Sequence, residues 1–98
     1  MARKATTTKN ASQNIQQTFS FTAPQAMSVL LAGDFTLWQE KAIPMKKETG
    51  GVWKATVALP RGTHEYRFIV DGQWHNDPAC TLQVPNTYGG KNSARQVA

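Results

Sequence analysis

Two tryptophans, Trp38 and Trp74, are the residues whose type and position most directly suggest a binding chemistry. Both stand near the ends of expected strands, and neither falls on the inward side of a strand alternation. Large exposed aromatic side chains often mark a binding surface. A flat indole ring packs against the face of a pyranose ring and attracts its polarised C–H groups. Two such rings at a fixed angle predict a curved α-glucan as the ligand.

The hydroxyl groups around a sugar ring need hydrogen-bond donors and acceptors as well. Arg67, Asn92 and Lys91 have suitable side chains, and Arg67 falls on the outward side of an expected strand. Each residue also has a purely structural interpretation: Arg67 can belong to a solvated sheet face, and Asn92 can start the last strand or hold a turn. Beside the two tryptophans, the binding interpretation is the one we carry forward for Arg67 and Asn92.

His75, Asp77 and Cys80 lie close together in the sequence and could belong to a catalytic or metal site. A cysteine nucleophile or a three-ligand metal site is conceivable there. However, Asp77 and Pro78 read as a turn, and no second cluster completes a site. No paired carboxylates are placed for glycosidic hydrolysis either. We therefore expect a non-catalytic protein without a metal or other cofactor.

Alternating apolar and polar residues predict the strands that must position these side chains. Phe19 and Phe21 alternate with polar residues, and the stretches 52–59 and 63–70 alternate throughout. Residues 28–32 form a continuous apolar run, which is typical of a strand covered on both faces. Short or final strands are expected at 43–47, 73–75 and 92–97, and residues 79–91 are expected to form a loop in which 81–84 can be extended.

Turn residues separate these segments, and none of them has a helical period. Asp71 and Gly72 form the strongest hairpin signal. The pattern predicts an all-β sandwich of about seven strands over residues 18–98. The expected core consists of Phe19, Phe21, Val29, Leu31, Trp53, Val57, Leu59, Tyr66, Phe68, Val70 and Val97.

Length and charge narrow the remaining possibilities. The chain has 98 residues, enough for one domain, and its longest apolar run is too short to span a bilayer. The net charge is +5. Residues 1–17 contain basic side chains and no acidic ones, so we expect a flexible basic tail there and a nearly balanced body. That distribution makes nucleic-acid binding the weaker alternative. The single Cys80 and the lack of an apolar leader fit a reducing, cytoplasmic location.

Four segments occur in an order that resembles a known family. They are residues 33–38 (GDFTLW), 62–74 (GTHEYRFIVDGQW), 76–78 (NDP) and 88–93 (YGGKNS). Together they are similar to the family 48 carbohydrate-binding modules. This family includes the glycogen-binding domain of the AMP-activated protein kinase β subunit and the N-terminal domains of isoamylases and glycogen-branching enzymes. The resemblance implies an immunoglobulin-like (early-set) β-sandwich.

The resemblance also implies roles for individual residues. The two stacking tryptophans correspond to Trp38 and Trp74, the basic sugar contact to Arg67, and the asparagine that bonds sugar hydroxyls to Asn92. A leucine finger of the β-subunit module falls at Tyr88, where an aromatic ring can stack instead, or cover the sandwich edge. A neighbouring threonine falls at Gly90, which has no side chain to offer.

We therefore expect a non-catalytic module that binds glycogen, starch-like chains or malto-oligosaccharides. The alternative is a regulatory or scaffolding subunit that docks on a partner protein, either a kinase or a glucan-active enzyme, through the same fold. Both functions can coexist in one domain.

Overall fold

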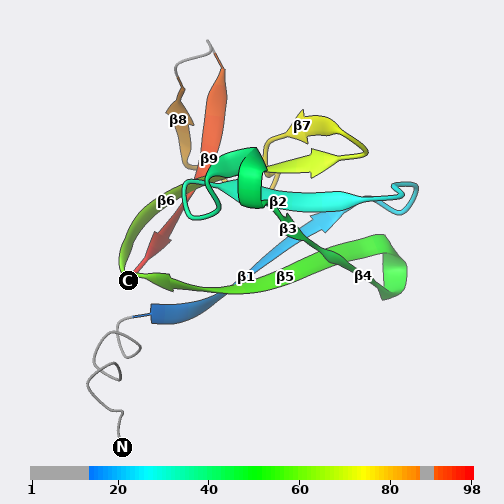
Figure 1. Ribbon diagram of the computed structural model, residues 1–98, viewed down its shortest axis with the longest axis horizontal. Coiled ribbons are helices and arrows are strands. Elements are labelled where there is room, and N and C mark those ends of the chain that lie inside the picture. Colours follow the sequence, from blue (N-terminus) through cyan, green and yellow to red (C-terminus); the bar gives the residue numbers. More distant parts are fainter. Residues whose placement is uncertain (1–13, 87–89) are drawn as a thin grey trace, which may run out of the picture.

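The computed structural model describes residues 14–86 and 90–98, in which two β-sheets pack face to face (Figure 1). The predicted all-β sandwich is confirmed. The strands are β1 (Asn14–Thr22), β2 (Val29–Gly33), β3 (Ile43–Pro44), β4 (Lys46–Glu48), β5 (Val52–Pro60), β6 (Gly62–Val70), β7 (Gln73–His75), β8 (Gln83–Pro85) and β9 (Lys91–Val97). Two short 3-10 turns, η1 (Trp38–Lys41) and η2 (Thr49–Gly51), complete the elements.

Strand β6 organises the larger sheet, whose order is β3-β2-β6-β9-β8 with β7 also paired to β6. The smaller sheet has the order β1-β5-β4. Along β6, the half nearer Gly62 pairs with β9, and the half nearer Val70 pairs with β2 and β7. The β8–β9 pair and the β7 strand therefore lie at successive positions along β6.

The expected single edge strand at 43–47 is two strands that belong to different sheets. Ile43–Pro44 pairs with β2, whereas Lys46–Glu48 pairs with β5. Met45 lies at the crossing, where its side chain is buried and its N–H donates to the carbonyl of Val29 at 2.9 Å. The described residues form nine strands where the pattern predicts about seven, because the segment 43–47 divides in two and Gln83–Pro85 forms the separate strand β8.

Strand β1 begins at Asn14, four residues before the Thr18 at which the alternation first becomes clear. Ile15 packs against the edge of the core, and Gln17 accepts a hydrogen bond from Arg95 at 3.1 Å. The sheet therefore includes residues 14–17 of the segment expected to be a tail. Pairing with β5 and the packing of one apolar residue, Ile15, are enough to extend the strand there. Residues 1–13 of that segment lie outside the described residues.

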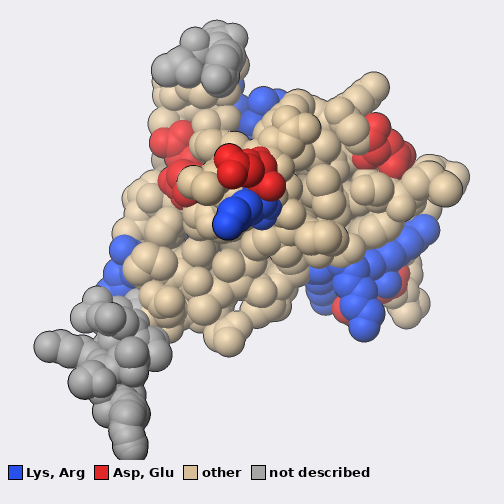
Figure 2. Space-filling model, in the orientation of Figure 1, with Lys and Arg blue, Asp and Glu red and all other residues tan. Residues whose placement is uncertain are grey.

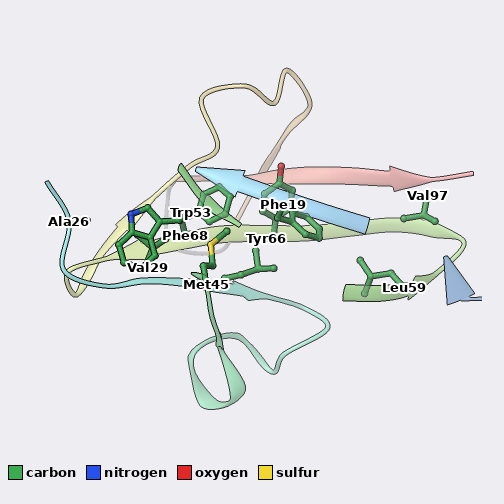
Figure 3. Packing of buried hydrophobic residues seen from close by; sticks show 10 residues of the cluster. Phe19, Ala26, Val29, Met45, Trp53, Leu59, Tyr66, Phe68 and Val97 are labelled. Atoms are coloured by element: carbon green, nitrogen blue, oxygen red, sulfur yellow. The ribbon is translucent and has the colours of Figure 1, made fainter. Parts of the chain in front are cut away.

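The core fills the space between the sheets, and it matches the predicted set (Figure 3). Eight of the eleven predicted residues are buried within it, and Phe21, Val57 and Val70 pack against it half-buried. Phe19 and Tyr66 form an edge-to-face ring pair with centroids 4.8 Å apart. Two further core residues, Ala26 and Met45, lie outside any alternation and were not predicted.

A buried hydrogen bond ties the core to the loop that follows β7. The Tyr66 hydroxyl donates to Asp77 Oδ2 at 2.6 Å, and the Ala79 N–H donates to Oδ1 at 2.9 Å. Burial, aided by the Asp77 carboxylate, raises the pKa of the Tyr66 phenol above its ordinary value, so the hydroxyl remains a donor. The contact fixes the first residues of the connection to β8.

Replacing Tyr66 with phenylalanine should therefore lower the free energy of unfolding by about 1.5–3 kcal/mol, because the buried carboxylate loses a donor. Urea denaturation of Y66F, D77N and the double variant measures this effect. The two single losses should add to more than the double loss, since they remove the same bond. Strict additivity would show that the bond contributes nothing.

Within the described ranges, no helix has the length and the apolar character that crossing a membrane requires.

Candidate functional site

A groove of about 850 Å³ crosses the outer face of the six-stranded sheet. Its volume lies within the range of pockets that bind small ligands. The groove is bounded by η1, by β6 and β7, and by the end of the β8–β9 pair. Its lining consists of Trp38, Gln39, Glu65, Arg67, Trp74, Pro85, Asn86, Gly90 and Asn92.

Strand alternation explains why residues from β6, β7 and β9 meet here. On β6, Tyr66 and Phe68 point into the core, so Glu65 and Arg67 point to the opposite face. Trp74 pairs across the strands with Ile69 and therefore shares that outer face. On β9, Asn92 has the same orientation, since its neighbour Ser93 pairs with Tyr66.

Trp38 reaches the groove through an unusual backbone. Both Leu37 and Trp38 have positive φ angles, of 55° and 56° respectively. Such conformations are costly for residues other than glycine, and they cluster at functional sites. The sequence does not predict this turn, because leucine and tryptophan, rather than glycine or asparagine, occupy its two left-handed positions.

The buried hydroxyl of Thr36 closes this turn. Thr36 Oγ1 accepts the N–H of Gly33 at 2.9 Å and donates to the carbonyl of Trp38, 2.8 Å away. The carbonyl of Gly33 lies at 3.0 Å and can share the same proton. The turn that carries Trp38 is therefore held from inside by one side chain.

The loop is also docked on β6 beside the groove floor. The Asp34 N–H donates to the Glu65 carbonyl, and the Glu65 N–H donates to Asp34 Oδ2, both at 3.0 Å. A Cβ atom on Gly33 would lie 2.6 Å from the Glu65 carbonyl oxygen, so glycine is required at that position. These contacts fix Trp38 relative to Glu65 and Arg67.

The two indole rings lie close together without stacking on each other. Their centroids are 6.5 Å apart, and their planes make an angle of 54°. Trp74 is 38% exposed, and Trp38 is half-buried. Two tilted apolar surfaces therefore line the groove.

Arg67 supplies the positive charge of the site. Its guanidinium carbon lies 5.7 Å from the centre of the Trp74 ring, within the range of a cation–π contact. Its Nε is buried and has no hydrogen-bond partner in the described part of the chain. The arginine is thus held by the indole, with donors available to a ligand.

Asn92 is more deeply placed than an exposed sugar contact would be, since only 7% of it is accessible. Its Nδ2 donates to Glu65 Oε1 at 3.0 Å, and its Oδ1 accepts Asn86 Nδ2 at 3.1 Å. Asn86 in turn accepts the N–H of Gly90 at 3.1 Å. A continuous polar chain therefore forms one wall of the groove, and Asn92 is its middle member.

Four of the five residues proposed from the sequence meet in this groove: Trp38, Arg67, Trp74 and Asn92. The fifth, Tyr88, lies outside the described residues. Sequence reasoning missed Gln39, Glu65, Pro85 and Asn86. Glu65 could have been found, because it shares an outward face with Arg67 two residues away. Gln39 is distant in the sequence from Pro85 and Asn86, and they meet only because η1 and the end of the β8–β9 pair border the same groove.

The three residues of the alternative cluster, His75, Asp77 and Cys80, have different surroundings. His75 is exposed, and Asp77 accepts a hydrogen bond from the Tyr66 hydroxyl. The Cys80 thiol donates to the Ala94 carbonyl at 3.2 Å. Cys80 and Asp77 line a separate hollow of about 370 Å³. Within residues 14–86 and 90–98, no group of three or more potential metal ligands is found.

Comparison with known proteins identifies the family of this sandwich. The family model of the glycogen recognition site of AMP-activated protein kinase matches residues 15–98. The subunit beta-1 of 5'-AMP-activated protein kinase from Sus scrofa is 39% identical over 69 residues, which cover 70% of this chain and 53% of that protein. The corresponding Homo sapiens subunit is 36% identical over 69 residues, or 70% of this chain and 24% of that protein.

A plant protein is also similar. Protein PTST homolog 2, chloroplastic, from Arabidopsis thaliana is 43% identical over 63 residues, which cover 64% of this chain and 12% of that protein. The chain thus spans only part of the length of each of these relatives. Because the family model covers nearly all of the described sandwich, the chain belongs to the carbohydrate-binding module family of the glycogen recognition site of AMP-activated protein kinase.

Proposed function

We propose that this domain is a non-catalytic module that binds α-1,4-linked glucans in the groove between Trp38 and Trp74. The observation that carries the proposal is the pair of indoles, tilted by 54°, on one face of a domain of this family. Successive rings of an α-1,4 chain turn relative to one another, so two tilted surfaces can each receive one ring. The rings of a flat β-1,4 chain lie too nearly in one plane to cover both.

Polar groups around the indoles suit the hydroxyls of such a chain. Arg67 donates, and the wall formed by Asn92 and Glu65 offers donors and acceptors at fixed positions. The groove is open and shallow, so we expect a dissociation constant roughly between micromolar and millimolar, about −4 to −8 kcal/mol. In this proposal Tyr88 adds a further stacking contact from the segment next to Gly90.

The proposal of a purely binding role is supported by the acidic groups at the site. Glu65 is the single carboxylate among the groove-lining residues that the structure describes. Glycosidic hydrolysis generally needs two carboxyl groups that face the bond to be cleaved. In this proposal the module holds a bound glucan close to a separate protein or domain that carries a catalytic activity.

A second role, docking on a partner protein, is favoured by the relatives that are named as kinase subunits. We propose that the domain brings a kinase or a glucan-active enzyme to its polysaccharide, with the groove left free for the sugar. A cytoplasmic location remains part of this proposal, and the partly exposed single cysteine is consistent with a reducing compartment.

Nucleic-acid binding is less well supported. Figure 2 shows acidic and basic side chains mixed on one face, with basic ones gathered over the end of β4 and β5. Lys46 and Lys54 lie opposite each other there. This cluster belongs to the other sheet from the groove and its aromatic rings, so charge and stacking surfaces are not combined.

Titration of the protein with maltoheptaose and with β-cyclodextrin, followed by tryptophan fluorescence, tests the proposal. We expect a saturable change with both ligands at concentrations up to about millimolar. Cellohexaose, which is β-1,4-linked, should cause no comparable change. A flat response to all three sugars would show that the groove does not bind glucans, and would leave the docking role as the function to pursue.

A further inference from the structure

Glu65 and Arg67 both line the groove, and they do not form an ion pair with each other. Glu65 and Arg67 are two residues apart on β6 and share its outer face. In the described part of the chain, the ion contact that forms is between His64 and Asp34, and Glu65 and Arg67 do not pair.

The arginine has hydrogen-bonding capacity to spare. Its guanidinium is held against the Trp74 ring, and its buried Nε donates to none of the described residues. A buried donor without an acceptor lowers stability, and such groups in native structures call for an explanation. The buried Nε is out of reach of a ligand, so the terminal nitrogens of the guanidinium are the atoms that can donate to a ligand hydroxyl in the groove.

The glutamate is oriented by the wall of the groove and keeps one oxygen available. Oε1 accepts from Asn92 Nδ2 at 3.0 Å, and Asn92 is itself fixed by Asn86. The other oxygen, Oε2, accepts no hydrogen bond from the residues that the structure describes. A carboxylate oxygen held in place this way is a strong acceptor for a hydroxyl proton.

We propose that Glu65 contacts the sugar directly and that it acts with Arg67 to grip two adjacent hydroxyls of one glucose ring. Arg67 donates to one hydroxyl, and the neighbouring hydroxyl donates to Glu65 Oε2. An internal residue of an α-1,4 glucan has one adjacent pair of free hydroxyls, at C2 and C3. The ring stacked on Trp74 therefore turns its C2–C3 edge toward β6 and its C6 hydroxyl away.

This inference rests on the proposed function, and methylated β-cyclodextrins separate the two. One derivative carries methyl groups at every O6, and another carries them at every O3. The wild-type protein should bind the O6-methylated ring about as well as β-cyclodextrin, and the O3-methylated ring at least about tenfold more weakly. Equal binding of both derivatives would overturn the inference while leaving glucan binding intact, and binding of no cyclodextrin would overturn the proposed function itself.

Glu65→Gln tests the residue. Glutamine can still accept from Asn92 through its oxygen, but it replaces the available acceptor with an NH₂ donor. We expect E65Q to bind β-cyclodextrin about tenfold more weakly and to lose most of the preference for free O3. Wild-type affinity and preference in E65Q would show that Glu65 only holds Asn92.

Glu40→Gln is the matched control, because it removes the same charge from an exposed residue of η1 that does not line the groove. E40Q should retain wild-type affinity, which would exclude a general charge effect. Thermal unfolding of E65Q confirms that it is folded. If it is not, the wild-type preference between the two methylated rings decides the question without the variant.

Discussion

Replacing Trp74 with alanine should weaken binding of maltoheptaose by at least about thirtyfold, or about 2 kcal/mol. The indole offers a ligand-facing surface, being 38% exposed, and it also holds the Arg67 guanidinium 5.7 Å from its ring centre. The substitution therefore removes a stacking surface and loosens a hydrogen-bond donor at once. Since the wild-type affinity is expected to be modest, W74A should show no saturable signal at millimolar sugar.

Isothermal titration calorimetry measures this loss without relying on the fluorescence of the residue that has been removed. Trp38→Ala should also weaken binding strongly, by removing the second of the two tilted surfaces. Met27→Ala is the control, because Met27 is a large apolar side chain that is 88% exposed and does not line the groove. Retained affinity in folded W74A would place the sugar elsewhere on the domain.

The folded state should largely survive the Trp74 substitution. Trp74 belongs to β7, a three-residue strand whose side chains are exposed, and it lies outside the core cluster. Exposed substitutions away from buried networks usually change the free energy of unfolding by about 0.5 kcal/mol or less. Urea denaturation should therefore give nearly wild-type stability, so that a loss of binding reports on the site.

The architecture was predictable because burial alternates along β5 and because Tyr66, Phe68 and Val70 of β6 share the core face. In such strands, the two-residue repeat identifies the core directly, and the same repeat places Arg67 outside it. The position of Trp74 followed from the tight turn at Asp71 and Gly72, which continues the sheet from β6. These are local signals that need no knowledge of distant contacts.

Other features depend on contacts between distant segments, which a local pattern does not contain. Met45 changes the sheet of its strand because its side chain fills the core and its N–H finds Val29. The chain of hydrogen bonds through Asn86, Asn92 and Glu65 exists only after β8 and β9 have paired with each other and with β6. Nothing in the spacing of these residues distinguishes them from ordinary loop and strand positions.

The orientation of Trp38 is a third feature of this kind, and it leads to the second large prediction. Its backbone is left-handed at two successive residues, neither of which favours that conformation. Such a turn persists only where the surroundings enforce it. The hydroxyl of Thr36, between the N–H of Gly33 and the carbonyl of Trp38, is the contact that does so.

Thr36→Val should therefore lower the free energy of unfolding by about 1–3 kcal/mol and weaken maltoheptaose binding by about tenfold. Valine has nearly the same shape, so the loss comes from the buried Gly33 N–H and the partly buried Trp38 carbonyl, which lose their hydroxyl partner. Thr36→Ser keeps the hydroxyl and should restore most of the affinity. Urea denaturation and calorimetric titration measure the two effects separately.

A positioning role differs from a general structural role in how it combines with the loss of Trp38. If Thr36 acts on binding by orienting that indole, then T36V should weaken binding in the wild-type background and have almost no further effect on the affinity of W38A. The stability cost should persist in both backgrounds, because the turn loses the same hydrogen bonds in each. An equal loss of affinity in both backgrounds would show that Thr36 supports the groove as a whole. Loss confined to the wild-type background would show that this one buried hydroxyl sets the angle between the two sugar-facing rings.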